Sequence, residues 1–363
     1  MKYIKSLDGV RALAILLVII FHYYYLLEVG WVGVQLFFVL SGFLITSILL
    51  NDKKYPLGFY LKRFYWRRSL RIFPLYYAYI MFIGIVYLIA NLPDSYAENL
   101  PWMLTYTFNY VPLFRPREFD IAFVHFWSLA VEEQFYLIWP LIIFLFSNNQ
   151  LKYVTLIIIV GCPFFRLLAY EWLLQNNYQD IGQTIYRLTP AQLDAFAIGS
   201  IIPIFKLSWT NKFTKSVSQF ILLLFIGFGV WNMLSLELGY TTLGYPIGST
   251  DNSQHIWSYT LINAGSAILI LYLTSQGGSK LSQILENRIL VEIGKVSYGM
   301  YVYHWIILAF FKKIVAPHIE SRVISLFLHV LVVYFISYLS FRFFEKYFID
   351  LKSKKFSSKS HES

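Results

Sequence analysis

The stretch SLDGVRALAILLVIIFHYYY, residues Ser6 to Tyr25, begins the chain with a run of apolar residues long enough to enter a lipid bilayer. It carries Arg11 near its start and His22 deep inside the apolar run. It has no small-residue cleavage site, and bulky tyrosines occupy its far end, so it lacks the features of a cleavable signal peptide. We therefore predict that it forms the first transmembrane helix.

The composition extends this interpretation to the whole chain. Of the 363 residues, 58% are hydrophobic and only 14% are charged, which excludes a water-soluble domain of this size. We predict an all-α polytopic membrane protein, with one transmembrane domain over residues 5–345 and a basic cytoplasmic tail over 346–363. Apolar runs suited to a hydrocarbon core of ~30 Å predict about ten transmembrane helices. These runs cover approximately residues 10–28, 33–50, 72–91, 126–146, 153–172, 190–206, 217–235, 257–275, 296–314 and 323–341.

The distribution of charge predicts how these helices are oriented. The net charge is +10, and most basic residues fall into alternate loops, including the segment KKYPLGFYLKRFYWRRSLR and the tail KSKKFSSK. Such loops face the cytoplasm in most membrane proteins, so both termini are predicted to be cytoplasmic. This topology and contact with membrane lipids explain the positive charge without a nucleic-acid partner. The single cysteine, Cys162, leaves no disulfide framework, and no metal site is expected.

Arg11 and His22 are predicted to lie on one face of the first helix. Eleven steps of ~100° return to nearly the same angular position, and a rise of ~1.5 Å per residue separates the two by about 16 Å along the axis. Arg11 alone could be an ordinary topology anchor, and a lone histidine could be a hydrogen-bond partner between helices. An ionisable group at this depth is costly, however, and usually faces a cavity. We therefore interpret His22 as functional.

A second group of polar residues lies in HFWSLAVEEQFYLIWPL, residues 125–141. Ser128 and Glu132 are four residues apart and share a helix face, whereas Glu133 points about 100° away. A carboxylate beside an imidazole can hold its tautomer and stabilise its protonated form. Glu132 is our preferred catalytic partner for His22. Glu133 is expected to form an ion pair with an arginine and so lock two helices together.

A third group is FYLKRFYWRRSLRIFPLYY, residues 59–77. Arg68 and Arg71 are three residues apart and share a face, with Arg67 beside them. Such a cluster could bind anionic lipid, but the guanidinium group also matches phosphate in a bidentate geometry. Together with Arg11, these arginines are a candidate dock for a cytosolic phosphorylated ligand.

Three further segments carry features that need a role. Small residues in GWVGVQLFFVLSGFLIT, residues 30–46, allow close packing of helices. Asp194 in YRLTPAQLDAFAIGS could be structural or could line a polar cavity, and His304 in VSYGMYVYHW is expected to be a packed or interfacial histidine. The segment 92–125 is the longest outer loop and a candidate lid or acceptor surface.

Taken together and in this order, these segments resemble the acyltransferase-3 family of bacterial membrane O-acyltransferases. The resemblance covers about residues 5–345. It implies a ten-helix protein of the bacterial cytoplasmic membrane that moves an acyl group, usually acetyl, from cytosolic acyl-CoA. The implied acceptor is a hydroxyl of an envelope glycan, such as O-antigen, or of a lipid-linked saccharide. The sequence departs from the family at Gln35, where many relatives carry an acidic residue, and at Gln192, where arginine is common.

The resemblance also implies roles for single residues. His22 is implied as the catalytic histidine, Arg11, Arg68 and Arg71 as the binding site for acetyl-CoA, and Ser128 and Glu132 as parts of the active-site helix. The flexible arm of coenzyme A would then extend from the cytoplasmic arginines along an opening toward His22. His22 would act as a general base or form an acyl-histidine intermediate. The competing interpretations are a transporter or flippase for an anionic or glycolipid substrate, and a non-catalytic scaffold for envelope assembly.

Overall fold

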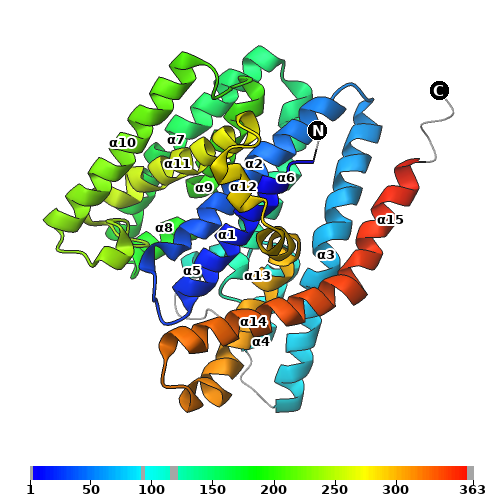
Figure 1. Ribbon diagram of the computed structural model, residues 1–363, viewed down its shortest axis with the longest axis vertical. Helices are drawn as coiled ribbons and strands as arrows, with labels where there is room; N and C mark the ends of the chain where they lie inside the picture. The colour runs from blue at the N-terminus through cyan, green and yellow to red at the C-terminus, as the bar shows by residue number, and fades with distance from the viewer. Residues whose placement is uncertain (1–2, 91–94, 115–121, 358–363) are drawn as a thin grey trace.

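The fold consists of helices, as the apolar runs predict. The computed structural model describes residues 3–90, 95–114 and 122–357, and all regular structure in these ranges is helical (Figure 1). A helix satisfies its backbone hydrogen bonds internally, which is what a segment in lipid requires. The all-α prediction is confirmed.

Each of the ten predicted runs coincides with one long helix. These helices are α1 (Lys5–His22), α2 (Val32–Asp52), α3 (Leu57–Ala90), α6 (Phe126–Leu145), α7 (Asn148–Gln175), α9 (Thr189–Ile204), α10 (Lys212–Ser235), α11 (Gln254–Ser275), α13 (Arg288–Ile314) and α14 (Arg322–Ser340). Among the described residues, seven helical stretches are long and apolar enough to cross a membrane, which confirms a polytopic membrane protein. The stretches do not include α1, α9 or α13, and α9 has only 16 residues. The total of ten spans therefore remains a prediction.

Short helices connect these long ones, and one further short helix, α15 (Lys346–Ser357), follows the last of them. The connecting helices are α4 (Ser95–Leu104), α5 (Val111–Phe114), α8 (Ile181–Arg187) and α12 (Lys280–Leu285), with single turns at Glu28–Trp31, Phe108–Tyr110, Tyr240–Thr242, Asp251–Ser253, Ala316–His318 and Phe341–Glu345. The predicted lid over 92–125 thus contains α4 and α5, and its parts at 92–94 and 115–121 lie outside the described residues. The predicted tail begins as α15, and residues 358–363 lie outside the described residues.

Among the helix boundaries that differ from the predicted ones, two bear on the site. The first helix ends at His22 rather than near residue 28, because Tyr24 and Tyr25 have φ values of 55° and 52° in the left-handed region. The third helix begins at Leu57 rather than near residue 72, so the basic segment is helical as well. As a result His22 lies in the last turn of α1, and the arginines of α3 have fixed directions.

Two close helix contacts hold the helices that carry the site. A Cβ at Gly42 of α2 would lie 2.1 Å from the carbonyl oxygen of Phe196 in α9, and one at Gly294 of α13 would lie 1.9 Å from that of Asp8 in α1. Only glycine permits such close approach of two backbones. Helices α1 and α2 lie near the middle of the view in Figure 1, with α7 and α10 to the upper left, α3 and α15 to the right, and α14 running across the bottom.

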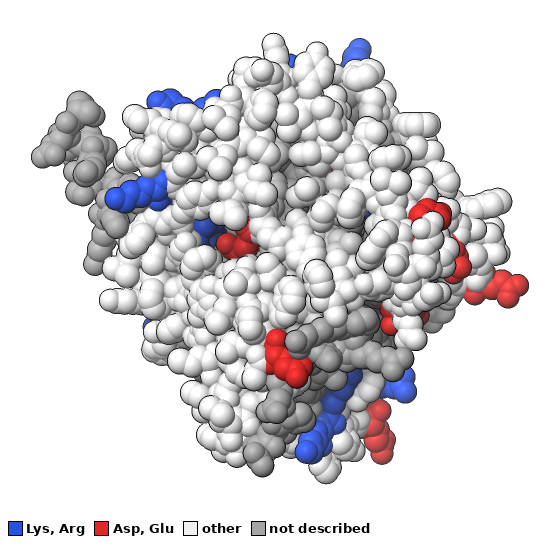
Figure 2. All heavy atoms as spheres, turned by 180° about the vertical axis from the view of Figure 1, so that it is seen from behind, with Lys and Arg blue, Asp and Glu red and all other residues white. Residues whose placement is uncertain are grey.

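The outer surface matches a lipid environment. Many of the exposed large apolar side chains belong to α7, α10 and α14. Most of the face seen in Figure 2 carries neither acidic nor basic side chains. An apolar surface this extensive is unusual for a soluble protein and typical of one that contacts hydrocarbon.

Candidate active site

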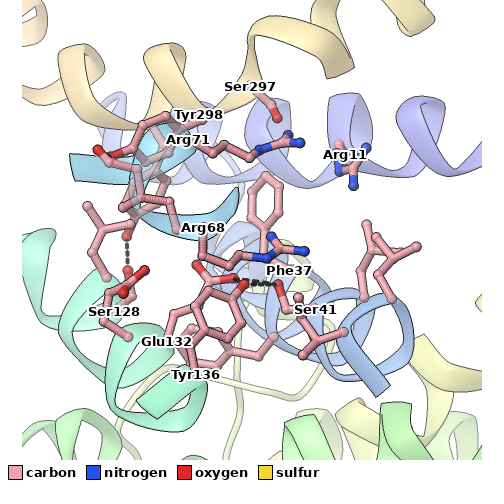
Figure 3. A pocket seen from close by; sticks show the side chains of 18 of the residues that line it. Arg11, Phe37, Ser41, Arg68, Arg71, Ser128, Glu132, Tyr136, Ser297 and Tyr298 are labelled. Carbon is pink, nitrogen blue, oxygen red and sulfur yellow. Dashed lines mark hydrogen bonds between the residues drawn. The ribbon is translucent and has the colours of Figure 1, made fainter. Parts of the chain in front are cut away.

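A cavity lined by basic and acidic side chains lies between α1, α2, α3, α6 and α13 (Figure 3). Its volume is about 890 Å³, including the part that is open to solvent. We call it the arginine cavity. The polar residues that line it are Arg11, Ser41, Arg68, Arg71, Ser128, Glu132, Glu133, Tyr136, Ser297, Tyr298 and Tyr301.

Three predicted arginines meet in this cavity. The guanidinium groups of Arg11, Arg68 and Arg71 point into the same space (Figure 3). Arg11 forms an ion pair with Asp8, whereas neither Arg68 nor Arg71 forms an ion pair with any described residue. Arg67 does not line the cavity, because adjacent residues on a helix point about 100° apart. The cavity therefore holds three positive charges, two of which have no acidic partner within the described ranges.

The polar residues of α6 face the same cavity. Ser128 and Glu132 both line it, one helical turn apart, as their spacing predicts. Glu132 accepts hydrogen bonds from Ser41, at 2.5 Å, and from Tyr136. Glu133 also lines the cavity, but among the described residues its Oε1 atom has no hydrogen-bond partner and its carboxylate has no ion pair. The arginine expected to lock Glu133 is not found in the described ranges, and the nearby Arg68 lies instead over the ring of Tyr136, at 5.2 Å.

His22 lines a second cavity, of about 970 Å³ including its open part, which we call the histidine cavity. Its walls are largely aromatic. The aromatic and polar residues that line it are Phe21, His22, Tyr25, Trp31, His125, Trp127, Gln183, Tyr186, Arg187, Tyr301 and Trp305. His22 is partly exposed to this space.

The partner of His22 is a histidine and not a carboxylate. The Nδ1 atom of His22 lies 3.0 Å from the Nε2 atom of His304 in α13. The ring of Trp305 lies edge-on to His22, with 4.5 Å between the ring centroids. Glu132 faces the arginine cavity instead and does not contact His22, so the expected pair of His22 and Glu132 is wrong. His304 is packed, as expected, but its contact with His22 was not predicted.

The two cavities have two lining residues in common, Val34 and Tyr301. The Tyr301 hydroxyl lies 2.5 Å from the Ser128 hydroxyl and donates a hydrogen bond of 3.0 Å to the carbonyl oxygen of His125. The expected single opening between the arginines and His22 is therefore divided, within the described residues, into two cavities that meet at this wall. Helix α1 borders both cavities, since it carries Arg11 at one end and His22 at the other.

Asp194 lines neither cavity. Its carboxylate forms an ion pair of 2.6 Å with Arg166, and both side chains are fully buried. Thr260 and Asn263 donate further hydrogen bonds to it. Asp194 therefore orients neither His22 nor any other described group of the two cavities.

The two departures from the family pattern contact each other. Nε2 of Gln35 donates a hydrogen bond of 2.8 Å to Oε1 of Gln192, and both side chains are fully buried. The two glutamines thus form a neutral, buried contact between α2 and α9. Neither glutamine leaves an uncompensated charge in the interior, which would be costly.

The fold and the two cavities define a polytopic membrane protein with a basic site and a histidine site on one central helix. The sequence profile described as an acyltransferase domain matches residues 4–342. The chain therefore belongs to the acyltransferase-3 family.

Two relatives illustrate the similarity. The chain is 30% identical to the peptidoglycan O-acetyltransferase OatA of Listeria monocytogenes, an alignment that covers 95% of this chain and 55% of the relative. It is 25% identical to the O-acetyltransferase OatA of Staphylococcus aureus strain NCTC 8325, over 95% of this chain and 57% of the relative. The chain thus spans a little over half the length of these relatives. No solved structure matches the chain.

Proposed function

We propose that this chain is a membrane O-acetyltransferase that moves an acetyl group from cytosolic acetyl-CoA to a hydroxyl of an envelope glycan or lipid-linked saccharide. The observation that carries the proposal is the arrangement of two cavities along α1, one basic and one containing His22. The family and the names of the relatives support an acetyl group and a glycan acceptor.

The arginine cavity suits the donor. Coenzyme A carries several phosphate charges and cannot cross a bilayer, so its nucleotide must bind on the cytoplasmic side. Arg68 and Arg71 have no acidic partner among the described residues and can bind phosphate oxygens in a bidentate geometry. The predicted topology places the start of α1, and hence Arg11, on that side.

The histidine cavity suits a carbohydrate acceptor. Trp31, Trp127 and Trp305 line it together with three tyrosines. Aromatic side chains provide large apolar faces that pack against the C–H groups of a sugar ring, and their polar edges hydrogen-bond to its hydroxyls. Gln183 and Arg187 add polar groups that can orient the sugar.

In the proposed reaction the acetyl donor and the acceptor hydroxyl meet at His22. The imidazole takes the proton of the acceptor hydroxyl, and the hydroxyl oxygen attacks the carbonyl carbon of the thioester. The C–S bond then breaks, the ester forms, and the leaving thiolate of coenzyme A takes the proton from His22. In the alternative route His22 attacks the thioester first and passes the acetyl group on from an acetyl-histidine. In both routes the thioester must pass the wall formed by Val34 and Tyr301.

The test of the proposal uses the full chain in proteoliposomes with radiolabelled acetyl-CoA and lipid-linked saccharides from the envelope. The wild-type protein should transfer acetyl to the saccharide. In His22→Ala the transfer rate should fall by a factor of about 100 or more, while the affinity for coenzyme A stays unchanged. Full activity of His22→Ala would remove His22 from the reaction. Movement of saccharide across the bilayer without thioester cleavage would identify a transporter instead.

The donor site is tested separately. Arg68→Gln and Arg71→Gln each remove one charge from the cavity, and a charge-assisted hydrogen bond contributes about 1.5–3 kcal/mol. The KM for acetyl-CoA should therefore rise about 10- to 100-fold for each variant. Arg67→Gln is the matched control, because Arg67 does not line the cavity. An unchanged KM in both cavity variants would contradict the donor site.

A further inference from the structure

We propose that His304 fixes the tautomer of His22, so that the proton of the neutral ring lies on Nδ1 and Nε2 is left as a bare base facing the histidine cavity. His304 would then be a positioning residue rather than a catalytic one. The inference rests on the proposed function, because it assigns His304 a role in the same reaction.

The argument starts at the backbone of α13. The Nδ1 atom of His304 lies 2.6 Å from the carbonyl oxygen of Tyr301. A carbonyl oxygen only accepts hydrogen bonds, so Nδ1 of His304 carries the proton. A neutral imidazole has one ring proton, and Nε2 of His304 is consequently an acceptor.

This acceptor determines the state of His22. Nδ1 of His22 lies 3.0 Å from Nε2 of His304 and must donate the hydrogen bond between the two rings. Nε2 of the neutral His22 ring then carries a lone pair, and this atom makes no hydrogen bond within the described residues. The contacts with Trp305, at 4.5 Å between ring centroids, and with Phe21, at 5.0 Å, hold the plane of the ring.

The neutral state of His304 follows from its surroundings. It is fully buried, and among the described residues no carboxylate lies within 4.0 Å of it or of His22. The nearest other ionisable ring is that of His125, with its centroid 5.0 Å away, and Lys312 lies further along the same helix. A protonated His304 would be a buried charge without a counter-ion, which is strongly unfavourable.

The arrangement takes over one task of the carboxylate in a Ser-His-Asp triad, because it fixes the tautomer without a charge on His304. In such triads the third residue holds the histidine in the correct tautomer and orientation. Here a neutral ring anchored on a backbone carbonyl provides the acceptor. When His22 takes the proton of the acceptor hydroxyl, the resulting cation remains hydrogen-bonded to Nε2 of His304.

The first measurement is ¹⁵N NMR of histidine-labelled wild-type protein in lipid, with His22→Ala and His304→Phe used to assign the signals. The ¹⁵N shifts distinguish protonated from bare ring nitrogens. We expect both His22 and His304 to carry their proton on Nδ1. His125 is an internal reference with the opposite tautomer, because its Nε2 atom lies 3.1 Å from the carbonyl oxygen of Val302. A proton on Nε2 of His22 in wild type would overturn the inference.

The second measurement is acetyl transfer by variants of His304. His304→Phe keeps an aromatic ring but removes the acceptor, so kcat should fall about 100-fold while the KM for acetyl-CoA stays unchanged. His304→Gln offers a side-chain oxygen as acceptor and should recover part of the rate. His329→Phe is the matched control, because His329 is fully buried and neither of its ring nitrogens has a partner among the described residues.

The outcomes separate the two proposals. Full activity of His304→Phe beside an inactive His22→Ala would overturn the role of His304 and leave the proposed function intact. Absence of transfer in wild type would overturn the function, whereas the NMR measurement would still decide the tautomer. If His304→Phe fails to fold, the wild-type spectrum, with the His22 signals assigned by His22→Ala, decides the inference.

Discussion

Arg166 and Asp194 illustrate, at the scale of residues, how this molecule holds charge in its interior. Both side chains are fully buried, and the guanidinium group also donates to the carbonyl oxygens of Ala191 and Ile256. Taking two charges out of water is costly, and the cost is offset only where hydrogen bonds satisfy the remaining atoms of both groups. The pair therefore stabilises the contact of α7, α9 and α11 only as long as both members are present.

The first prediction concerns this pair. Asp194→Leu leaves the charge of Arg166 uncompensated and should lower the free energy of unfolding by about 3–5 kcal/mol. The double variant Arg166→Met/Asp194→Leu should lose clearly less of the free energy of unfolding than Asp194→Leu alone. Thermal unfolding in detergent micelles measures the difference. The control is Glu292→Gln, which breaks an exposed ion pair with Lys295 and should change stability by less than about 1 kcal/mol. Equal losses for the single and double variants would contradict the prediction.

Residues that line the cavities were predictable where the neighbouring sequence alone made them unusual. An ionisable side chain inside an apolar run marked His22, and a spacing of four residues placed Ser128 and Glu132 on one cavity. Contacts between distant segments were not predictable, because helical periodicity says which face a residue occupies but not which helix packs there. His22 and His304 are 282 positions apart, and Gln35 and Gln192 are 157 apart.

At the scale of helices, the crossing of α2 and α9 depends on two glycines. A Cβ at Gly42 would lie 2.1 Å from the carbonyl oxygen of Phe196, and one at Gly199 would lie 2.0 Å from that of Val39. Both distances are far below a normal contact, so any side chain there must push the two helices apart. The neighbouring Ser41 points away from α9, and its hydroxyl donates a hydrogen bond to the Glu132 carboxylate.

The second prediction follows from this crossing. Gly42→Ala and Gly199→Ala should each destabilise the protein by about 1–3 kcal/mol, because overpacking forces the backbones to shift. Gly161→Ala in α7 is the matched control. Its Cβ would meet nothing within 4 Å, so alanine should raise stability slightly through its better helix propensity. Unfolding temperatures in one detergent compare the three variants, and similar values for all of them would refute the close crossing.

The positions of helices were more predictable than their ends. Apolar length marked all ten long helices, but α1 stops at His22 because Tyr24 and Tyr25 adopt left-handed backbone conformations. No sequence rule assigns that conformation to tyrosine, which rarely adopts it. Likewise α3 continues through the basic segment, since arginine, lysine and tyrosine can all extend a helix at a membrane surface.

At the scale of the whole molecule, the orientation in the membrane remains a prediction from charge. Seven described stretches meet the criteria of length, hydropathy and few charged residues for a span, whereas α1, α9 and α13 do not. Helix α1 lies in the centre of the fold, but its 18 residues include three charged ones, Lys5, Asp8 and Arg11, which is more than a candidate span contains. The charged side chains at its start thus weaken the transmembrane signal of this helix.

The third prediction tests this orientation. Cys162 is the single cysteine and is buried, so Cys162→Ala provides a background without accessible thiols. Tyr240→Cys lies between α10 and α11, and Lys280→Cys lies at the start of α12. A membrane-impermeant maleimide added to intact spheroplasts should label the cysteine at 240 but label that at 280 only after permeabilisation. The reverse pattern would invert the predicted topology.

The wall between the two cavities has a consequence for the cell as well as for the reaction. A permanently open channel between the two cavities that is wide enough for an acetyl thioester would also conduct protons. It would thereby dissipate the electrochemical gradient across the membrane. Val34 and Tyr301 stand where such a channel would pass, and the Tyr301 hydroxyl is tied to α6 by Ser128. On the proposed function, the opening between the cavities is never empty. It is closed by Tyr301 before the donor binds, and it is filled by the flexible arm of acetyl-CoA once the tyrosine side chain has moved aside.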